Sequence, residues 1–283
     1  MVRVRMEAAA SRTAALVAAY RGRATGRPDP VCNDPWAAEL AGDAGRSFAA
    51  QFDEAFPHGE LWVALRTWFL DARVALAMDA GVAQVVILGA GLDTRAARLA
   101  RPGVRFFEVD HPSSQAHKLA AVAALEGYPR DAASYVGCDF EKEDFLTRLE
   151  AGGFRVDAPA VIVWEGVTYY LTEGAVRSTL RRIAEGCHAA SLVMFDLVRR
   201  RLVTGDVRDP GDRATGQVVA GLGEPLRFGI DDVLPLLAEE GFRFVATASF
   251  DELCLARTGT YERRRKFRFQ HVAIASRGAP LLT

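Results

Sequence analysis

Carboxylates and glycines stand directly after four apolar runs of the chain. Runs of this composition are typical of buried parallel strands, whose carboxyl ends lie together along one edge of a sheet. One acid after a strand is common, but four such features in register indicate a single crevice that binds a nucleotide-like cofactor. The residues at these positions are Gly89-Ala90-Gly91, Asp110, Asp139 and Glu165.

The glycine turn separates two classes of cofactor. A dinucleotide site uses Gly-x-Gly-x-x-Gly, in which the third glycine packs helix against strand and the helix start binds the pyrophosphate. Here Thr94 stands at the third glycine position, and Asp93 precedes it. Unless Asp93 serves only as a helix cap, its carboxylate repels a pyrophosphate and suits a cation such as the amino group of a methionine moiety. The pattern therefore favours S-adenosylmethionine over a nicotinamide dinucleotide.

The elements that must position these groups alternate between strand and helix. This alternation predicts an α/β fold with a doubly wound, mostly parallel sheet. A helix at 231–240 and two further strands, near 243–249 and at 267–275, complete the expected order, and the last two strands form a hairpin-like antiparallel pair at one edge. The expected parallel strands are 84–88, 105–109, 134–137, 160–164 and 191–195.

Two segments flank the predicted crevice. Residues 1–80 are expected to form a helical cap on a core of residues 81–283, and the whole is expected to be one structural unit. Residues 197–230 are polar and rich in glycine and proline, which is typical of a lid or substrate-binding insertion. The expected cap helices are 6–22, a second that Asp34 caps with Pro35 at its first position, and 60–80.

Composition excludes several other functions. The 35 Lys and Arg nearly balance the 36 Asp and Glu, which argues against a nucleic-acid or anionic-membrane partner. No run approaches the roughly 18 apolar residues of a membrane span, and no signal peptide is evident. The use of cysteine fits a reducing cytoplasm, which is the expected location. The four cysteines have neither metal-ligand nor disulfide-framework spacing, and no metal is expected; they are Cys32, Cys138, Cys187 and Cys254.

The motifs around these positions resemble those of the leucine carboxyl methyltransferase family, and in particular a bacterial branch that includes polyketide carboxyl O-methyltransferases. The similarity extends over nearly the whole chain. It implies a Rossmann-like class I methyltransferase fold, S-adenosylmethionine as donor and S-adenosylhomocysteine as product. The similar segments include Gly89-Ala90-Gly91-Leu92-Asp93-Thr94-Arg95, Phe107-Glu108-Val109-Asp110-His111-Pro112, Cys138-Asp139-Phe140 and Glu165-Gly166-Val167-Thr168-Tyr169-Tyr170-Leu171.

The resemblance also implies roles for single residues. The glycine turn would hold the methionine part of the cofactor, with Asp110 at the ribose hydroxyls. Asp139 would accept from the adenine amino group, with Phe140 against the ring, and Glu165 would lie near the methionine and sulfonium end. An arginine of the 60–80 helix binds the cofactor carboxylate in relatives; Arg66 is the candidate, Arg21 is the second, and Trp68 stands where many bacterial members carry another arginine.

The methyl acceptor is constrained by acid–base chemistry. A carboxylate, with a pKa of about 4, is already ionised near neutral pH, whereas a phenol, with a pKa of about 10, needs a general base. No His-Asp or Lys-Glu constellation stands out, which favours a carboxylate of a small molecule, expected to be a secondary metabolite. Tyr169 and Tyr170 either position the acceptor or only pack. Hydroxyl methylation, a protein C-terminal carboxylate, a nicotinamide oxidoreductase and a non-catalytic cofactor-binding protein are the alternatives.

Overall fold

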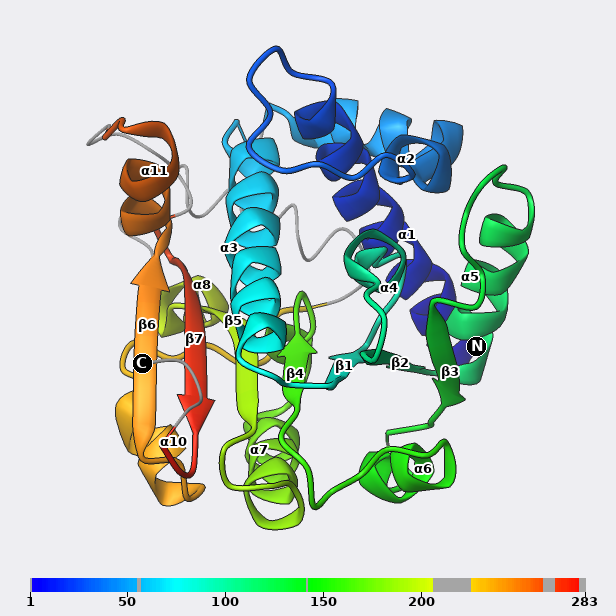
Figure 1. Ribbon diagram of the computed structural model, residues 1–283. Coiled ribbons are helices and arrows are strands. Elements are labelled where there is room, and N and C mark those ends of the chain that lie inside the picture. Colours follow the sequence, from blue (N-terminus) through cyan, green and yellow to red (C-terminus); the bar gives the residue numbers. More distant parts are fainter. Residues whose placement is uncertain (1, 55–56, 141, 206–224, 262–267, 280–283) are drawn as a thin grey trace.

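A computed structural model of the 283-residue chain describes residues 2–54, 57–140, 142–205, 225–261 and 268–279, with side chains from residue 12 onward. Its centre is a seven-stranded sheet in the order β3-β2-β1-β4-β5-β7-β6 (Figure 1). Strands β1 to β5 are parallel, and β7 pairs antiparallel with both β5 and β6. The strands are β1 (Gln84–Leu88), β2 (Arg105–Asp110), β3 (Ala133–Gly137), β4 (Val161–Trp164), β5 (Leu192–Val198), β6 (Phe244–Ser249) and β7 (Gln270–Ser276).

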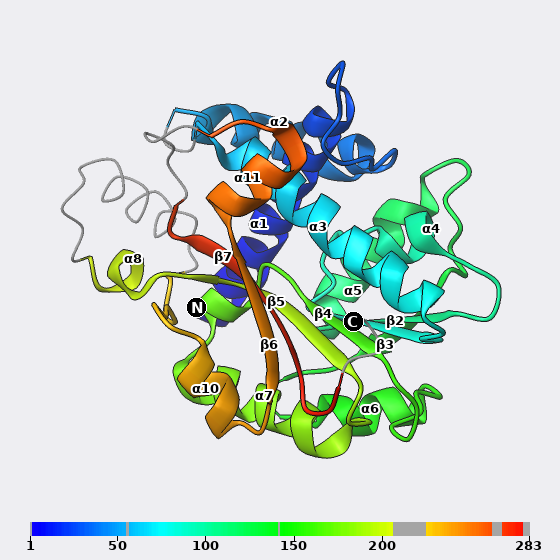
Figure 2. The ribbon, with the colours of Figure 1, turned by 60° about the vertical axis from the view of Figure 1, so that its left-hand side comes forward.

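Helices cover both faces of the sheet (Figure 2). On one face lie the N-terminal helices with α5 and α11, and on the other lie α6, α7 and α10. The helices are α1 (Val2–Thr25), α2 (Ala37–Phe52), α3 (Gly59–Asp79), α4 (Arg95–Leu99), α5 (Pro112–Ala123), α6 (Phe145–Ala151), the short 3-10 helix η1 (Thr168–Tyr170), α7 (Glu173–Gly186), α8 (Arg200–Thr204), α10 (Leu234–Glu239) and α11 (Phe250–Thr258).

Strand β1 shows why the sheet is buried on both faces. All five of its residues are buried, and successive side chains of a strand point to opposite faces. Val85 and Ile87 pack in the core under α1 and α3, whereas Val86 and Leu88 pack in the core with α6 and α7. The continuous apolar run in the sequence is therefore required by burial on two sides.

The predicted Rossmann-like α/β fold with an antiparallel edge is confirmed, and two local predictions were wrong. Strands β6 and β7 pair antiparallel, but helix α11 lies between them instead of a hairpin turn. A capping box between Ser249 and Glu252 starts this helix. Helix α2 begins at Ala37, so Asp34 and Pro35 precede it and Trp36 takes the N-cap position. Of the predicted 197–230 insertion, residues 206–224 lie outside the described part of the chain.

The turn after β1 needs glycine for two reasons. Gly89 and Gly91 have φ of +66° and +47°, a backbone region that favours glycine. A Cβ on Gly89 would also lie 2.6 Å from the Cγ2 atom of Val167, beyond the end of β4. The turn therefore lies close against the chain that leaves β4, and this brings two of the predicted site segments together.

Candidate functional site

A cavity of about 420 Å³ opens at the carboxyl ends of β1, β2 and β4. Helix α1 and Arg66 of α3 close it from the side of the N-terminal helices. Its lining combines a glycine turn, carboxylates, arginines and apolar side chains. The lining residues are Thr13, Ala14, Val17 and Arg21 of α1, Arg66 of α3, Ile87, Gly89, Ala90, Gly91, Leu92, Asp93, Asp110, Ser113, Ser114, His117, Phe140, Glu165, Gly166, Val167 and Tyr170.

Most of the residues predicted for the site line this cavity. Two do not, Asp139 and Tyr169. Asp139 lies beside the cavity-lining Phe140, where its carboxylate contacts the ammonium of Lys142. Tyr169 is buried, and its ring centroid lies 4.7 Å from that of Tyr170. The predicted residues that line the cavity are Arg66, Gly89, Ala90, Gly91, Asp93, Asp110, Phe140, Glu165 and Tyr170.

Asp110 fixes the glycine turn to the end of β2. Its Oδ2 atom accepts from the backbone N–H of Gly91 at 2.6 Å, and its Oδ1 atom accepts from the N–H of His111 at 2.7 Å. Burial raises the pKa of this carboxyl, which the two backbone donors lower in part. A carboxylate oxygen can accept more than one hydrogen bond, so this group can also accept from a diol such as the ribose hydroxyls.

Glu165, at the end of β4, is held between two arginines. Its Oε1 atom lies 2.8 Å from Nε of Arg66, and its Oε2 atom lies 2.5 Å from Nη2 of Arg95. Arg66 also contacts the carboxylate of Asp196, which is fully buried in β5. Burial raises the pKa of the Glu165 carboxyl, but Arg66 and Arg95 outweigh this effect and the net shift is downward. Glu165 is therefore a carboxylate at neutral pH despite its burial.

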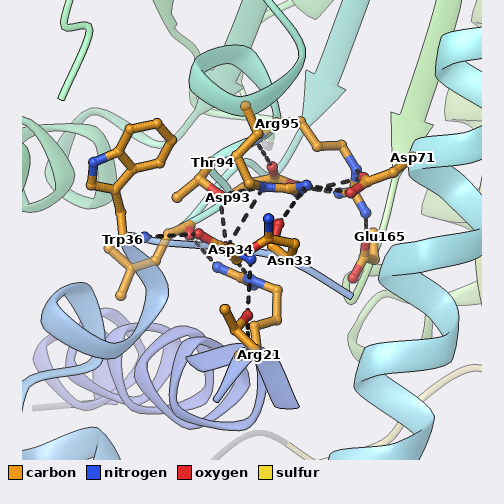
Figure 3. A network of polar contacts seen from close by, with 12 residues as sticks. Arg21, Asn33, Asp34, Trp36, Asp71, Asp93, Thr94, Arg95 and Glu165 are labelled. Atoms are coloured by element: carbon orange, nitrogen blue, oxygen red, sulfur yellow. Dashed lines mark hydrogen bonds and ion pairs between the residues drawn. The ribbon is translucent and has the colours of Figure 1, made fainter. Parts of the chain in front are cut away.

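The ion-pair network continues from Arg95 toward the N-terminal helices (Figure 3). Nε of Arg95 lies 2.7 Å from Oδ1 of Asp71 in α3, and its Nη1 atom contacts the carboxylate of Asp93. Arg98 contacts the same Asp71. The two arginines of α4 thus connect the glycine turn to helix α3.

Asp34 belongs to this network and does not cap a helix as predicted. Its Oδ2 atom pairs with Nε of Arg21 at 2.8 Å and accepts from the hydroxyl of Thr94 at 2.7 Å (Figure 3). Nη2 of Arg21 donates to the carbonyl oxygen of Leu92 at 2.6 Å. Helix α1 is therefore anchored to the glycine turn, and Thr94 in place of a third glycine supplies one of the anchoring hydroxyls.

Carboxylates outnumber arginines in this described network. Arg21, Arg66, Arg95 and Arg98 face five carboxyl groups, so the network contains one more acidic group than basic groups. A cationic ligand in the cavity would compensate the additional acidic group in its ionised form, because buried charges are stable only when paired. The five carboxylates are Asp34, Asp71, Asp93, Glu165 and Asp196.

The cavity therefore fits the group that the sequence predicted. Gly89 and Gly91 have no side chain of their own, so the backbone of the turn borders the cavity directly. The Oε2 atom of Glu165 is buried and has no hydrogen-bond partner of good geometry, although its ion pair with Arg95 is close. An ammonium or sulfonium group at this end of the cavity would lie near the lining carboxylates Asp93 and Glu165.

Sequence reasoning missed four residues of the network, namely Asp71, Arg95, Arg98 and Asp196. Arg95 stands inside a motif that was otherwise interpreted, and Asp196 follows the fifth apolar run as the other acids follow theirs. The acid at the fifth strand was thus a usable signal. Asp71 carried none, because it is one of several polar residues on a long amphipathic helix.

The described part of the chain supports neither a metal site nor a membrane-spanning helix. The described residues include no group of three or more His, Cys, Asp or Glu side chains that could hold a metal ion. Among the helices that the structure describes, none is long and apolar enough to cross a membrane.

Comparison with known proteins agrees with this geometry. The model of the leucine carboxyl methyltransferase family matches residues 14–184. A protein of Mycolicibacterium vanbaalenii, provisionally named an S-adenosyl-L-methionine-dependent methyltransferase, is 33% identical over 223 residues, which cover 70% of this chain and 73% of that protein. A Frankia alni protein with the same provisional description is 36% identical over 217 residues, 74% of each chain.

Solved structures show the same fold at low sequence identity. A DUF574 family protein from Streptomyces avermitilis aligns with a TM-score of 0.64 and 15% identity, covering 92% of this chain and 97% of its own. A Thermobifida fusca protein, provisionally named a methyltransferase, aligns with a TM-score of 0.62 and 17% identity, covering 94% of each. With the match over residues 14–184, the chain belongs to the leucine carboxyl methyltransferase family and is an S-adenosylmethionine-dependent methyltransferase.

Proposed function

We propose that this methyltransferase is an O-methyltransferase that acts on a carboxylate of a small molecule, in particular a secondary metabolite. S-adenosylmethionine supplies an electrophilic methyl group on a sulfonium, and the acceptor oxygen displaces it in line. The protein then has to position the acceptor at attack distance and exclude water. The N-terminal helices and the predicted 197–230 insertion would supply the acceptor side, over a core of residues 81–283.

The donor half of the site is assigned as follows. Asp110 receives the ribose hydroxyls, and Phe140 packs against the adenine ring, with Asp139 toward the adenine amino group. Support for the first two comes from the cavity, which both residues line. The backbone of the Gly89–Gly91 turn cradles the methionine part. The ammonium and sulfonium of the methionine part face Asp93 and Glu165, in agreement with the larger number of acidic than basic groups in the network.

Two arginines line the cavity and are candidates for the methionine carboxylate. Arg66 contacts both Glu165 and Asp196, so two carboxylates already surround its charge. Arg21 forms an ion pair with Asp34 at 2.8 Å, and this carboxylate also lies 3.8 Å from Nε of Arg98. Because one carboxylate pairs with Arg21 and two pair with Arg66, the surroundings favour Arg21 over Arg66 for an ion pair with the methionine carboxylate.

The carboxylate acceptor is supported by the acid–base properties of the cavity wall. Burial raises the pKa of Asp93, but Arg95, Arg21 and Arg98 outweigh it and bring that pKa to about 2. The pKa of Glu165 is likewise lowered. Groups this acidic are poor general bases for a phenol with a pKa of about 10. His117 also lines the cavity, but it lies in α5 beside Ser113 and Ser114, on the Asp110 side.

Tyr170 and Tyr169 are proposed to position the acceptor. Tyr170 lines the cavity together with Val167 and with the apolar Ala14 and Val17 of α1. The edge-to-face packing of Tyr169 on Tyr170 fixes the orientation of the outer ring. An apolar wall around a carboxylate oxygen strips it of water, which increases its nucleophilicity.

The proposal is tested by labelling. The enzyme is incubated with a small-molecule extract of its source cells and S-adenosylmethionine that carries a deuterated methyl group, and products are found by mass spectrometry. A labelled product that mild alkali hydrolyses to the free acid is a methyl ester and supports the proposal. A labelled product that resists alkali is not a methyl ester and would refute the carboxylate acceptor; fragmentation that places the label on an ether oxygen would assign the enzyme to hydroxyl or phenol methylation instead.

A further inference from the structure

Arg95 contacts three carboxylates but does not line the cavity. It is the first residue of α4 and is 1% exposed. Its guanidinium meets Asp71 in α3 at 2.7 Å, Glu165 at the end of β4 at 2.5 Å, and Asp93 in the glycine turn (Figure 3). A planar guanidinium with five N–H donors can hold several oxygens in fixed directions, which a lysine ammonium cannot do.

Two of these three carboxylates face the ligand. Asp93 and Glu165 both line the cavity, whereas Asp71 lies outside it, in a groove next to α3. Arg95 therefore joins two ligand-facing groups from behind and is itself anchored to α3. Because like charges that lie close together oppose each other's ionisation, Asp93 and Glu165 need a shared cation if both are to be carboxylates at once.

We propose that Arg95 is a positioning residue, which keeps Asp93 and Glu165 together in their ionised form and aimed at the cationic end of the cofactor. This inference rests on the assignment of the cavity as the S-adenosylmethionine site. Arg95 itself touches neither cofactor nor acceptor. Its effect on the reaction passes through the two carboxylates.

The inference predicts different changes in affinity for S-adenosylmethionine and for its product S-adenosylhomocysteine. S-adenosylmethionine carries a sulfonium that S-adenosylhomocysteine lacks, while both carry the ammonium. Loss of one carboxylate charge should therefore weaken binding of S-adenosylmethionine more than binding of S-adenosylhomocysteine. A role of Arg95 in packing alone would weaken both equally.

The inference also sets a dependence on pH. Without Arg95, one of the two carboxylates should take up a proton near neutral pH, so affinity for the cationic cofactor should fall as the pH is lowered from 8 to 6. In the wild type both groups stay ionised over this range, and affinity should change little. The other charged groups around the two carboxylates include Arg21 from α1, Arg66 from α3, Arg98 from α4, Lys118 from α5, Glu108 from β2 and Asp196 from β5.

The test is calorimetric titration of the folded full-length protein with each ligand at pH 8 and pH 6. For Arg95→Met we expect S-adenosylmethionine to bind about tenfold more weakly at pH 8 and weaker still at pH 6, with a smaller change for S-adenosylhomocysteine. Arg95→Lys should restore part of the difference. Arg101→Gln is the control: it removes an exposed ion pair with Asp79, outside the site, and should bind both ligands as the wild type does.

Asp71→Asn is the second variant, in case Arg95→Met does not fold. It loosens the anchor of Arg95 without altering a cavity-lining residue and should show the same pattern with a smaller amplitude. Equal weakening of both ligands at both pH values, with no recovery in Arg95→Lys, would overturn the inference, as would unchanged affinities. If the wild type itself fails to bind S-adenosylmethionine, the cavity assignment falls and the inference with it; if the wild type binds and only the variants disagree, the inference alone falls.

Discussion

Replacing Lys118 with methionine would isolate the energy of one buried ion pair behind the site. Lys118 in α5 and Glu108 in β2 are each 1% exposed. The Lys118 ammonium contacts the Glu108 carboxylate and also the carbonyl oxygen of Asp93. Removing one partner of a buried pair costs about 3–5 kcal/mol, because the remaining charge is uncompensated. We expect Lys118→Met to lower the free energy of unfolding at pH 8 by an amount in this range.

The size of this loss should depend on pH. Burial raises the pKa of Glu108, and Lys118 lowers it in part, so the variant should have a still higher folded-state pKa. A folded pKa above the unfolded value of about 4.3 means that the folded protein binds the proton more tightly. Stability is then greatest below the unfolded pKa and is lost as the pH rises through the folded pKa. Since one pKa unit corresponds to about 1.4 kcal/mol, the loss in Lys118→Met should be smaller at pH 5 than at pH 8 by about 1 kcal/mol or more.

Urea unfolding followed by circular dichroism at pH 8 and pH 5 measures these values. The double variant Lys118→Met with Glu108→Gln removes both charges and should recover much of the stability at pH 8. Lys142→Met is the matched control, because it removes an ion pair of a lysine that is 62% exposed and should cost less than about 1 kcal/mol. A loss that is the same at both pH values, or that is additive in the double variant, would show that packing rather than charge explains it.

Three further predictions concern the cofactor and are read out by calorimetric titration with S-adenosylmethionine. Asp110→Ala and Asp139→Ala should each weaken binding about tenfold or more, because each loses a charged acceptor; unchanged affinity in both would refute the ribose and adenine assignments. Arg21→Gln should weaken binding of S-adenosylmethionine more than binding of its decarboxylated analogue, and an equal effect on both would argue for Arg66. Gly89→Ala should abolish binding, because a Cβ there lies 2.6 Å from Val167 and φ is +66°; retained affinity would mean that the turn can move.

Much of the donor site was predictable because its signals are local. The apolar run at 84–88 predicts strand β1, and the glycines after it predict a turn with unusual backbone angles, as found at Gly89 and Gly91. Acids at the ends of successive parallel strands meet because sheet geometry forces those ends to one edge. That rule needs no knowledge of side-chain contacts. It was sufficient to bring Asp110 and Glu165 to one cavity.

Ion pairs between distant residues could not be predicted in this way. The sequence pattern at Asp34, followed by Pro35, indicated a helix cap, but in the structure its carboxylate pairs with Arg21 and with the hydroxyl of Thr94. Helix α11 follows directly on β6, and the predicted hairpin-like pair left no helix for residues 250–266, although Ser249 and Glu252 form a capping box there.

By itself, the sequence therefore determined the α/β fold, the strand ends that form the site and the class of cofactor, because these follow from hydrophobic periodicity and backbone conformation. Only the tertiary structure decided which charges meet. Arg95 is 24 positions from Asp71 and 70 from Glu165 along the chain, yet it contacts both. No local pattern contains such contacts, since they exist only once α3, α4 and β4 have packed and burial has forced each charge to find a partner.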